Sequence, residues 1–313
     1  MNSQPVVFLL GPTASGKTGA SIALAKSLDA EIISVDSALV YRGMDIGTAK
    51  PDMQERDGIA HHVIDVCTPD VAYSVARFCE DAMLAIEDVR GRGKRALLTG
   101  GTMLYFSALE KGIAPLPEAD ATLRDALSSD AQRLGWPKMH ERLTNIDPVA
   151  ASRIHPNDPQ RIQRALEVYE LTGKPLSDLQ KNTQPLLDMP PLKFALVPDS
   201  RAWLHERIER RFVQMLSAGF LDELKHLRES YTLHAALPAM RSVGYRQAWE
   251  HLVGDTDFET MIDKAQAATR QLAKRQITWI RGMENLNKIS CDQFDEHQQL
   301  TQMLDIIAKK TSV

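Results

Sequence analysis

Residues Val6–Thr18 read VVFLLGPTASGKT, an apolar run that ends in a glycine-rich segment. The apolar run is typical of a buried parallel strand, and the residues after Thr18 follow a helical pattern. The glycine-rich segment matches G-x-x-x-x-G-K-[ST], the phosphate-binding loop that joins a strand to a helix. We therefore predict that residues 11–18 bind a phosphate group.

Each part of this segment has a role in such a loop. Glycines at positions 11 and 16 let the backbone direct its N–H groups toward a phosphate, and the helix that follows adds partial positive charge at its N-terminus. Lys17 adds a full positive charge, and Thr18 adds a hydroxyl group suited to Mg²⁺. The predicted phosphate-binding residues are Gly11, Pro12, Thr13, Ala14, Ser15, Gly16, Lys17 and Thr18.

The composition is that of an ordinary globular protein, because 43% of the 313 residues are apolar and 25% are charged. The chain has no apolar run long enough for a membrane helix, and its first residues lack the features of a secretory signal. Its three cysteines are too few and too scattered for a disulfide framework or a zinc site. We therefore expect a cytoplasmic protein that does not bind membranes.

The first hundred residues alternate between strand and helix patterns, which predicts an α/β fold with a parallel sheet and helices on both faces. Two proline-rich breaks, at residues 113–120 and 189–191, enclose a segment with helical patterns. We predict a core of residues 1–116 and 191–313 with an all-helical insertion at residues 117–190. The patterns place strands near residues 6–10, 31–36, 61–66, 95–102 and 193–199, mainly helices after residue 203, and a frayed helix in the last dozen residues.

Asp36 and Thr102 follow predicted strands, as the phosphate-binding loop does, and the carboxyl ends of parallel strands share one edge of a sheet. A carboxylate at position 36 can hold Mg²⁺ through water or accept a proton from a nucleophile, or it can cap a helix. Thr102 can donate to an anionic oxygen or belong to a structural turn. The second of these strands ends in Gly-Gly-Thr, where an ATPase carries a second acid, and this weakens the ATPase interpretation.

The net charge of −4 argues against indiscriminate binding of nucleic acids, but basic residues gather locally. Residues 270–281 contain four basic residues and no acidic one, and positions 270, 274 and 281 share a helix face. Arg161 and Arg164 also share a face, and residues 241–246 combine hydrogen-bond donors with a glycine and an aromatic ring. Each set fits either a polyanion-binding surface or a solvated helix face, and Trp279 fits the core better than a base-stacking platform.

Taken together, seven segments closely resemble the bacterial-type tRNA dimethylallyltransferase family, in the family's order and over nearly the whole chain. The family modifies adenosine 37 of tRNA, beside the anticodon. The matching segments are GPTASGKT (11–18), DSALVYRGMDIGTAKP (36–51), HHVIDV (61–66), LTGGTMLY (98–105), HPNDPQRIQRALEVYELTGKP (155–175), MRSVGYRQ (240–247) and TRQLAKRQITWIRG (269–282).

The resemblance implies a P-loop NTPase-like core whose loop binds the diphosphate of dimethylallyl diphosphate with Mg²⁺. The adenosine N6 attacks the allylic carbon, Asp36 takes its proton, and Thr102 and Arg211 contact the diphosphate. The resemblance further implies binding to the anticodon stem-loop of tRNAs reading codons that begin with U. We expect a monomer, because the sequence shows no long apolar stripe that would be exposed. The implied tRNA-binding residues are Asp36, Ser37, Ala38, Leu39, Thr102, Arg124, Gln160, Arg161, Ile162, Gln163, Arg164, Arg241, Ser242, Val243, Gly244, Tyr245, Arg246, Lys274, Arg275, Gln276, Ile277, Thr278, Trp279, Ile280 and Arg281.

Three alternatives compete with this interpretation. A phosphotransferase would require a second acid and a lid of arginines. A free-nucleotide isopentenyltransferase shares the loop and the aspartate, but it needs neither the arginine-bearing insertion nor the basic C-terminal helix. A nucleotide-gated RNA-binding module without catalytic activity ranks last, because Asp36 is suited to act as a base.

Overall fold

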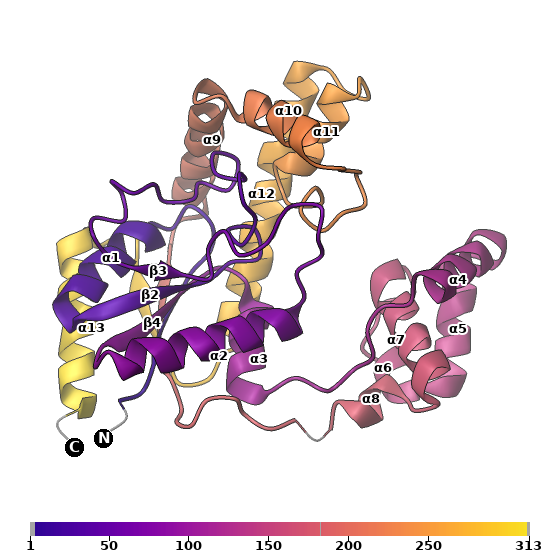
Figure 1. Ribbon diagram of the computed structural model, residues 1–313, viewed down its shortest axis with the longest axis horizontal. Coiled ribbons are helices and arrows are strands. Elements are labelled where there is room, and N and C mark those ends of the chain that lie inside the picture. The colour runs from indigo at the N-terminus through magenta and orange to yellow at the C-terminus, as the bar shows by residue number, and fades with distance from the viewer. Residues whose placement is uncertain (1–3, 182, 312–313) are drawn as a thin grey trace. The chain divides into compact units, whose positions relative to one another are not determined.

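The computed structural model describes residues 4–181 and 183–311. A six-stranded sheet in the order β3-β2-β4-β1-β5-β6, with every pair parallel, forms the centre of the fold (Figure 1). The predicted α/β fold is therefore confirmed. The strands are β1 (Val7–Leu10), β2 (Ala30–Val35), β3 (His61–His62), β4 (Arg95–Gly100), β5 (Leu192–Val197) and β6 (Leu286–Ser290).

Alternate side chains of β1 meet helices on opposite faces of the sheet. Val7 and Leu9 belong to the core cluster that α1 and α13 complete, whereas the Phe8 ring lies 4.9 Å from that of Phe106 on α3. Both faces are therefore covered, which explains why all four residues of β1 are buried. The helices of this part are α1 (Lys17–Leu28), α2 (Val75–Gly91), α3 (Met103–Lys111), α9 (Arg201–Ser217), α10 (Phe220–Ser230), α11 (Tyr245–Leu252), α12 (Phe258–Arg281) and α13 (Glu296–Thr311).

Two strand predictions needed correction. Residues 61–66 were expected to form a strand, but only His61–His62 pairs with β2, because Val63 and Asp65 both have φ near +59° and turn the chain away. The edge strand β6 lies in the part of the chain where mainly helices were expected and no strand was predicted. Its sequence, LNKIS, has little of the apolar character by which a buried strand is recognised, since only Ile289 is fully buried.

Two helix predictions needed correction as well. The sequence predicts the helix with the basic residues over positions 269–281, but α12 begins at Phe258, because the Asp257 side chain caps it by accepting the Thr260 N–H. The C-terminal helix was expected to fray, but α13 lies beside α1 and buries Met303 and Ile307 in the core (Figure 1). The last two residues of the chain lie outside the described residues.

Residues 111–185 form a separate compact unit, which we call the helical unit, and residues 1–110 and 186–313 form the core unit. The sequence had predicted the insertion at 117–190. Residues 186–190 belong instead to the core unit, because the Leu186 N–H donates to the Leu109 carbonyl at 3.1 Å and Asp188 pairs with Arg90. The helices of the helical unit are α4 (Ala121–Leu134), α5 (Trp136–Ile146), α6 (Pro148–Ala151), α7 (Pro159–Thr172) and α8 (Leu176–Leu179).

The helical unit has its own apolar core, in which Leu143, Ile162 and Leu166 are completely buried. The sequence predicts Asp158 as the N-cap of α7 and Gly173 as its end, and both are confirmed: the Asp158 side chain accepts the Arg161 N–H, and Gly173 ends the helix with φ of 69°. Across both units, none of the described helices is long and apolar enough to cross a membrane.

Candidate active site

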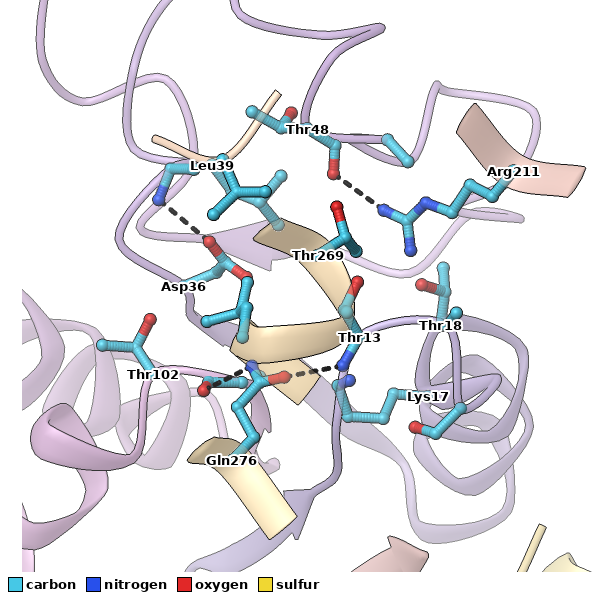
Figure 2. A pocket seen from close by; sticks show the side chains of 18 of the residues that line it. Thr13, Lys17, Thr18, Asp36, Leu39, Thr48, Thr102, Arg211, Thr269 and Gln276 are labelled. Atoms are coloured by element: carbon cyan, nitrogen blue, oxygen red, sulfur yellow. Dashed lines mark hydrogen bonds between the residues drawn. The ribbon is translucent and has the colours of Figure 1, made fainter. Parts of the chain in front are cut away.

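A cavity of about 960 Å³ opens at the carboxyl edge of the sheet, and all of its lining residues belong to the core unit. The loops that follow β1, β2 and β4 form its floor, as the parallel topology predicts. Helices α9 and α12 supply its walls. Asp36, Thr102, Arg211 and residues 13–18 of the phosphate-binding loop all line this one cavity (Figure 2). The predicted phosphate-binding residues Gly11 and Pro12 are not among its lining residues.

The phosphate-binding loop is shaped by two residues in the left-handed region, Ala14 with φ of 63° and Gly16 with φ of 89°. A side chain at Gly11 would lie 2.8 Å from the Leu196 carbonyl, so that position requires glycine. Helix α1 begins directly afterwards at Lys17, and its N-terminus therefore faces the cavity. This is the arrangement by which loops of this type bind phosphate groups.

Lys17 is the principal cation of the loop. Its Nζ atom donates to the Pro12 carbonyl at 2.6 Å. Burial lowers the pKa of Lys17 to about 8; the Asp36 carboxylate opposes this shift, and Arg211 adds to it. The ammonium group is thus poised to gain stabilisation from an incoming anion.

Helix α9 contributes two arginines one turn apart. Arg211 donates to the Thr48 carbonyl at 3.0 Å, and burial lowers its pKa (Figure 2). Arg207 donates from Nε to the Ala14 carbonyl at 2.8 Å and lies over the Trp203 ring. Sequence reasoning missed Arg207, although its spacing of four residues from Arg211 places both on one helix face.

Asp36 and Thr102 lie at the ends of neighbouring strands. The Asp36 Oδ1 atom accepts the Ala38 N–H at 2.9 Å, so the carboxylate stabilises a turn, and no helix begins there for it to cap. The Thr102 hydroxyl accepts the Ser37 N–H at 3.0 Å. These bonds hold both side chains at the cavity.

Residues 241–244, which the resemblance assigned to tRNA binding, all line the cavity. Tyr245, by contrast, is fully buried, and its hydroxyl donates to Glu223. Its side chain has no surface to offer RNA, and neither have those of Ile162 and Ile280. Any contact of these three residues with tRNA would therefore have to come from their backbone atoms.

The four basic side chains in residues 270–281 of α12 have different surroundings. Lys274, Arg275 and Arg281 are exposed, whereas Arg270 pairs with Glu209 of α9 at 3.1 Å. The sequence segment contains no acid, but the fold supplies one. Trp279 was expected in the core, yet it is 47% exposed and lines the cavity, because α12 turns its other face, with Ala273 and Ile280, inward.

In the helical unit, the predicted tRNA-binding arginines have unequal surroundings. Arg161 is exposed and pairs with Asp158, whereas Arg124 and Arg164 both donate to the buried Glu167 carboxylate. Gln163 donates to the Arg124 carbonyl. Arg124 and Arg164 therefore hold the unit together, whatever else they contact.

The oxygen-bearing side chains of the cavity suit a magnesium ion that is held mainly by its substrate. In the described ranges, 4–181 and 183–311, no group of three or more His, Cys, Asp or Glu side chains could hold a metal ion. Thr18 and Asp36 both line the cavity and offer oxygen atoms. Such a small donor set fits Mg²⁺, which keeps several waters and binds largely through substrate phosphates.

Comparison with known proteins identifies the relatives of this chain. The IPP transferase family model matches residues 39–283, and the isopentenyl transferase model matches residues 4–68. The curated tRNA dimethylallyltransferase of Alkalilimnicola ehrlichii is 58% identical over 88% of this chain and 87% of its own length. That of Methylococcus capsulatus is 55% identical over 88% of this chain and 89% of its own length.

Solved structures agree in fold. The tRNA isopentenylpyrophosphate transferase of Bacillus halodurans is 36% identical with a TM-score of 0.72, and the match covers 98% of this chain and 97% of that one. A eukaryotic dimethylallyltransferase acting on tRNA is 30% identical with a TM-score of 0.78, over 92% of this chain and 74% of that one. The chain described here belongs to the IPP transferase family of tRNA dimethylallyltransferases.

Proposed function

We propose that this protein transfers the dimethylallyl group of dimethylallyl diphosphate to N6 of an adenosine in tRNA, giving N6-(dimethylallyl)adenosine and pyrophosphate. One observation carries the proposal. A phosphate-binding loop, Arg207, Arg211 and the Asp36 carboxylate line one cavity in a chain that belongs to this family. The finer proposals are that adenosine 37 of the anticodon stem-loop is the acceptor, in tRNAs reading codons that begin with U, and that a monomer acts in the cytoplasm.

The leaving group is the diphosphate, which gains negative charge as the allylic C–O bond breaks. Lys17, Arg211 and the N–H groups at the start of α1 are placed to stabilise this charge, and such stabilisation is often the largest catalytic contribution. Mg²⁺ at Thr18 would supply further positive charge to the diphosphate. Because a leaving group rather than a water molecule is activated, the reaction needs no second acid at the end of β4.

The acceptor is a poor nucleophile, because the lone pair of an exocyclic adenine amine is delocalised into the ring. A general base therefore assists the reaction, and the role of Asp36 as this base is supported by its carboxylate, which lines the cavity directly after β2. The N6–C1 bond forms, the C1–O bond breaks, its electron pair leaves with pyrophosphate, and the proton passes to Asp36. Thr102, held beside Ser37, is placed to contact the diphosphate or the acceptor.

Several exposed groups suit the binding of an RNA loop. Arg241 and Arg275 line the cavity and can contact the backbone of tRNA, and Trp279 offers a half-exposed ring for stacking. An adenosine of a tRNA loop can reach Asp36 only after it has left the stack of neighbouring bases. Enzymes that modify bases commonly extrude the target base in this way. In the helical unit, Arg161 is a further candidate.

The proposal is tested by incubating the protein with Mg²⁺, dimethylallyl diphosphate and unmodified tRNA, followed by mass spectrometry of the nucleosides. We expect N6-(dimethylallyl)adenosine, and sequencing of the modified tRNA should place it at position 37. Parallel reactions replace tRNA with AMP, or dimethylallyl diphosphate with ATP. Prenylated AMP without modified tRNA, or consumption of ATP alone, would contradict the proposal.

A further inference from the structure

Gln276 joins two loops of the site that lie far apart in the sequence. It belongs to α12 and is only 7% exposed. Its Oε1 atom accepts the N–H of Thr13 in the phosphate-binding loop at 2.9 Å, and its Nε2 atom donates to the carbonyl of Gly101 at 2.8 Å. Figure 2 shows the amide between the two loops, with one dashed bond on each side.

The Gly101 end of this bridge leads directly to the acceptor side of the site. Gly101 precedes Thr102, whose hydroxyl accepts the N–H of Ser37, the neighbour of Asp36. A Cβ atom at Gly101 would lie 2.4 Å from the Gln276 Nε2 atom, so glycine at this position is what allows the amide to approach. A continuous set of bonds thus runs from Thr13 through Gln276 and Gly101 to the turn at Asp36.

We propose that Gln276 is a positioning residue, which sets the spacing between the leaving-group side of the site and its acceptor side, and that it is not a tRNA contact. This inference rests on the proposed function. The sequence had placed Gln276 among the tRNA-binding residues. Gln276 is buried, and its amide already makes two hydrogen bonds within the protein, so the side chain does not offer these groups to tRNA.

An amide meets the two requirements of this position at once, because it offers one acceptor and two donors on a planar group. A glutamate of the same shape still accepts the Thr13 N–H, but it turns a second acceptor toward the Gly101 carbonyl. Two oxygen atoms, of the glutamate and of the Gly101 carbonyl, then face and repel each other. In a buried setting the lost hydrogen bond also costs stability. The β1 and β4 loops then separate, and a displacement of about 1 Å can cost on the order of 100-fold in rate.

The test compares Gln276→Glu with Gln299→Glu. Gln299 is a matched control, because it is 5% exposed, donates to the Phe294 carbonyl at 2.7 Å, and lies outside the cavity lining. In Gln276→Glu we expect kcat to fall by about 10- to 100-fold and the KM for dimethylallyl diphosphate to rise, with the KM for tRNA unchanged. Gln299→Glu should retain wild-type constants, and Arg275→Ala should raise the KM for tRNA instead.

A second variant tests the other end of the bridge. Gly101→Ala pushes the amide away, so it should reproduce the kinetic pattern of Gln276→Glu, and the double variant should be no worse than either single one. If Gln276→Glu does not fold, Gly101→Ala carries the same test. A rise in the KM for tRNA alone, or additive effects in the double variant, would overturn the inference.

Binding of inorganic pyrophosphate with Mg²⁺, measured by calorimetry, separates this inference from the proposed function. Weaker pyrophosphate binding in Gln276→Glu than in Gln299→Glu supports the positioning role even if the wild-type protein modifies no tRNA. Equal pyrophosphate affinities together with unchanged kcat would contradict it.

Discussion

Asp36 and Lys17 illustrate how single residues acquire their chemistry from their surroundings. The Asp36 carboxylate is held at the cavity because its Oδ1 atom accepts the Ala38 N–H, and Lys17 is held by the Pro12 carbonyl. Burial then lowers the pKa of Lys17 to about 8. Neither property can be read from the residue type, because each depends on the surroundings of the side chain.

Asp36→Asn should separate proton transfer from structure. The amide oxygen can still accept the Ala38 N–H, so the turn is retained, but an amide does not take up the N6 proton. We expect the single-turnover rate to fall by about 10²- to 10⁴-fold, with pyrophosphate affinity little changed. Rapid-quench measurement of prenylated tRNA checks this, and a rate close to that of the wild type would remove Asp36 as the base.

The lowered pKa of Lys17 predicts a pH dependence of diphosphate binding. Between pH 8 and 10.5 the folded protein holds Lys17 largely neutral while the unfolded chain keeps it charged, so this residue's contribution to stability rises with pH there. An anion favours the charged form, and binding at pH 9 should therefore take up a proton. Calorimetry in two buffers of different ionisation enthalpy measures this uptake.

The control for this experiment is Lys17→Arg, which stays charged over the same pH range and should remove the proton uptake. Pyrophosphate affinity of the wild-type protein should decrease as the pH rises above 8. Binding at pH 9 that releases protons, or that exchanges none, is the outcome that contradicts the assignment.

At the scale of elements, the 24 residues of α12 serve two purposes on two faces. One face buries Ala273 and Ile280 and directs Gln276 to the phosphate-binding loop. The other exposes Lys274 and Arg275. The helix therefore connects a basic outer surface with the floor of the cavity, and its N-cap at Asp257 fixes where it begins.

The basic surface of α12 should contribute to tRNA binding through the exposed side chains of Lys274, Arg275 and Arg281. Lys274→Ala should weaken tRNA binding and lower the slope of log K against log salt by about 0.7 to 0.9. Arg270→Ala should lower the slope less, because Glu209 already balances the charge of Arg270. Fluorescence titrations at several salt concentrations compare the two variants. Equal slopes would show that the Arg270–Glu209 ion pair has no influence on the salt dependence of tRNA binding.

At the scale of the whole molecule, the two units have separate cores and separate internal networks. Glu167 organises the helical unit: its buried carboxylate accepts hydrogen bonds from Arg124, Arg164 and the Asp120 N–H. Burial alone would raise the pKa of Glu167, but these hydrogen bonds outweigh it and lower the pKa. The cavity that we propose as the diphosphate site is lined only by residues of the core unit.

Glu167→Gln should therefore affect one unit and spare the other. We expect a loss of about 2 kcal/mol in the stability of the helical unit, seen as faster hydrogen exchange in residues 111–185. The loss should shrink as the pH falls below about 4.5, because protonation of Glu167 removes the same charge in the wild-type protein. Affinity for tRNA should decrease while that for pyrophosphate stays constant. A loss of affinity for both ligands would contradict the expectation that the substitution affects only the helical unit.

The limits of sequence reasoning follow from which interactions are local. The phosphate-binding loop and the ends of α7 were predictable, because a strand–loop–helix motif and capping residues act over a few positions. The edge strand β6 was not, because its residues gain their pairing only from β5. The exposure of Trp279 and the burial of Tyr245 depend on helices that pack from elsewhere in the chain.

By itself, the sequence determined the α/β fold, the phosphate-binding loop and the family, since these rest on residue order and on short-range geometry. Only the tertiary structure decided which basic residues stay unpaired, which predicted tRNA contacts are buried, and that Gln276 joins two strand ends. The ion pair of Arg270 with Glu209 joins residues 61 positions apart and the bond of Gln276 to Thr13 joins residues 263 positions apart, and such contacts form only when helices and strands pack together. Their partners therefore depend on the complete fold, and no local pattern in the sequence records them.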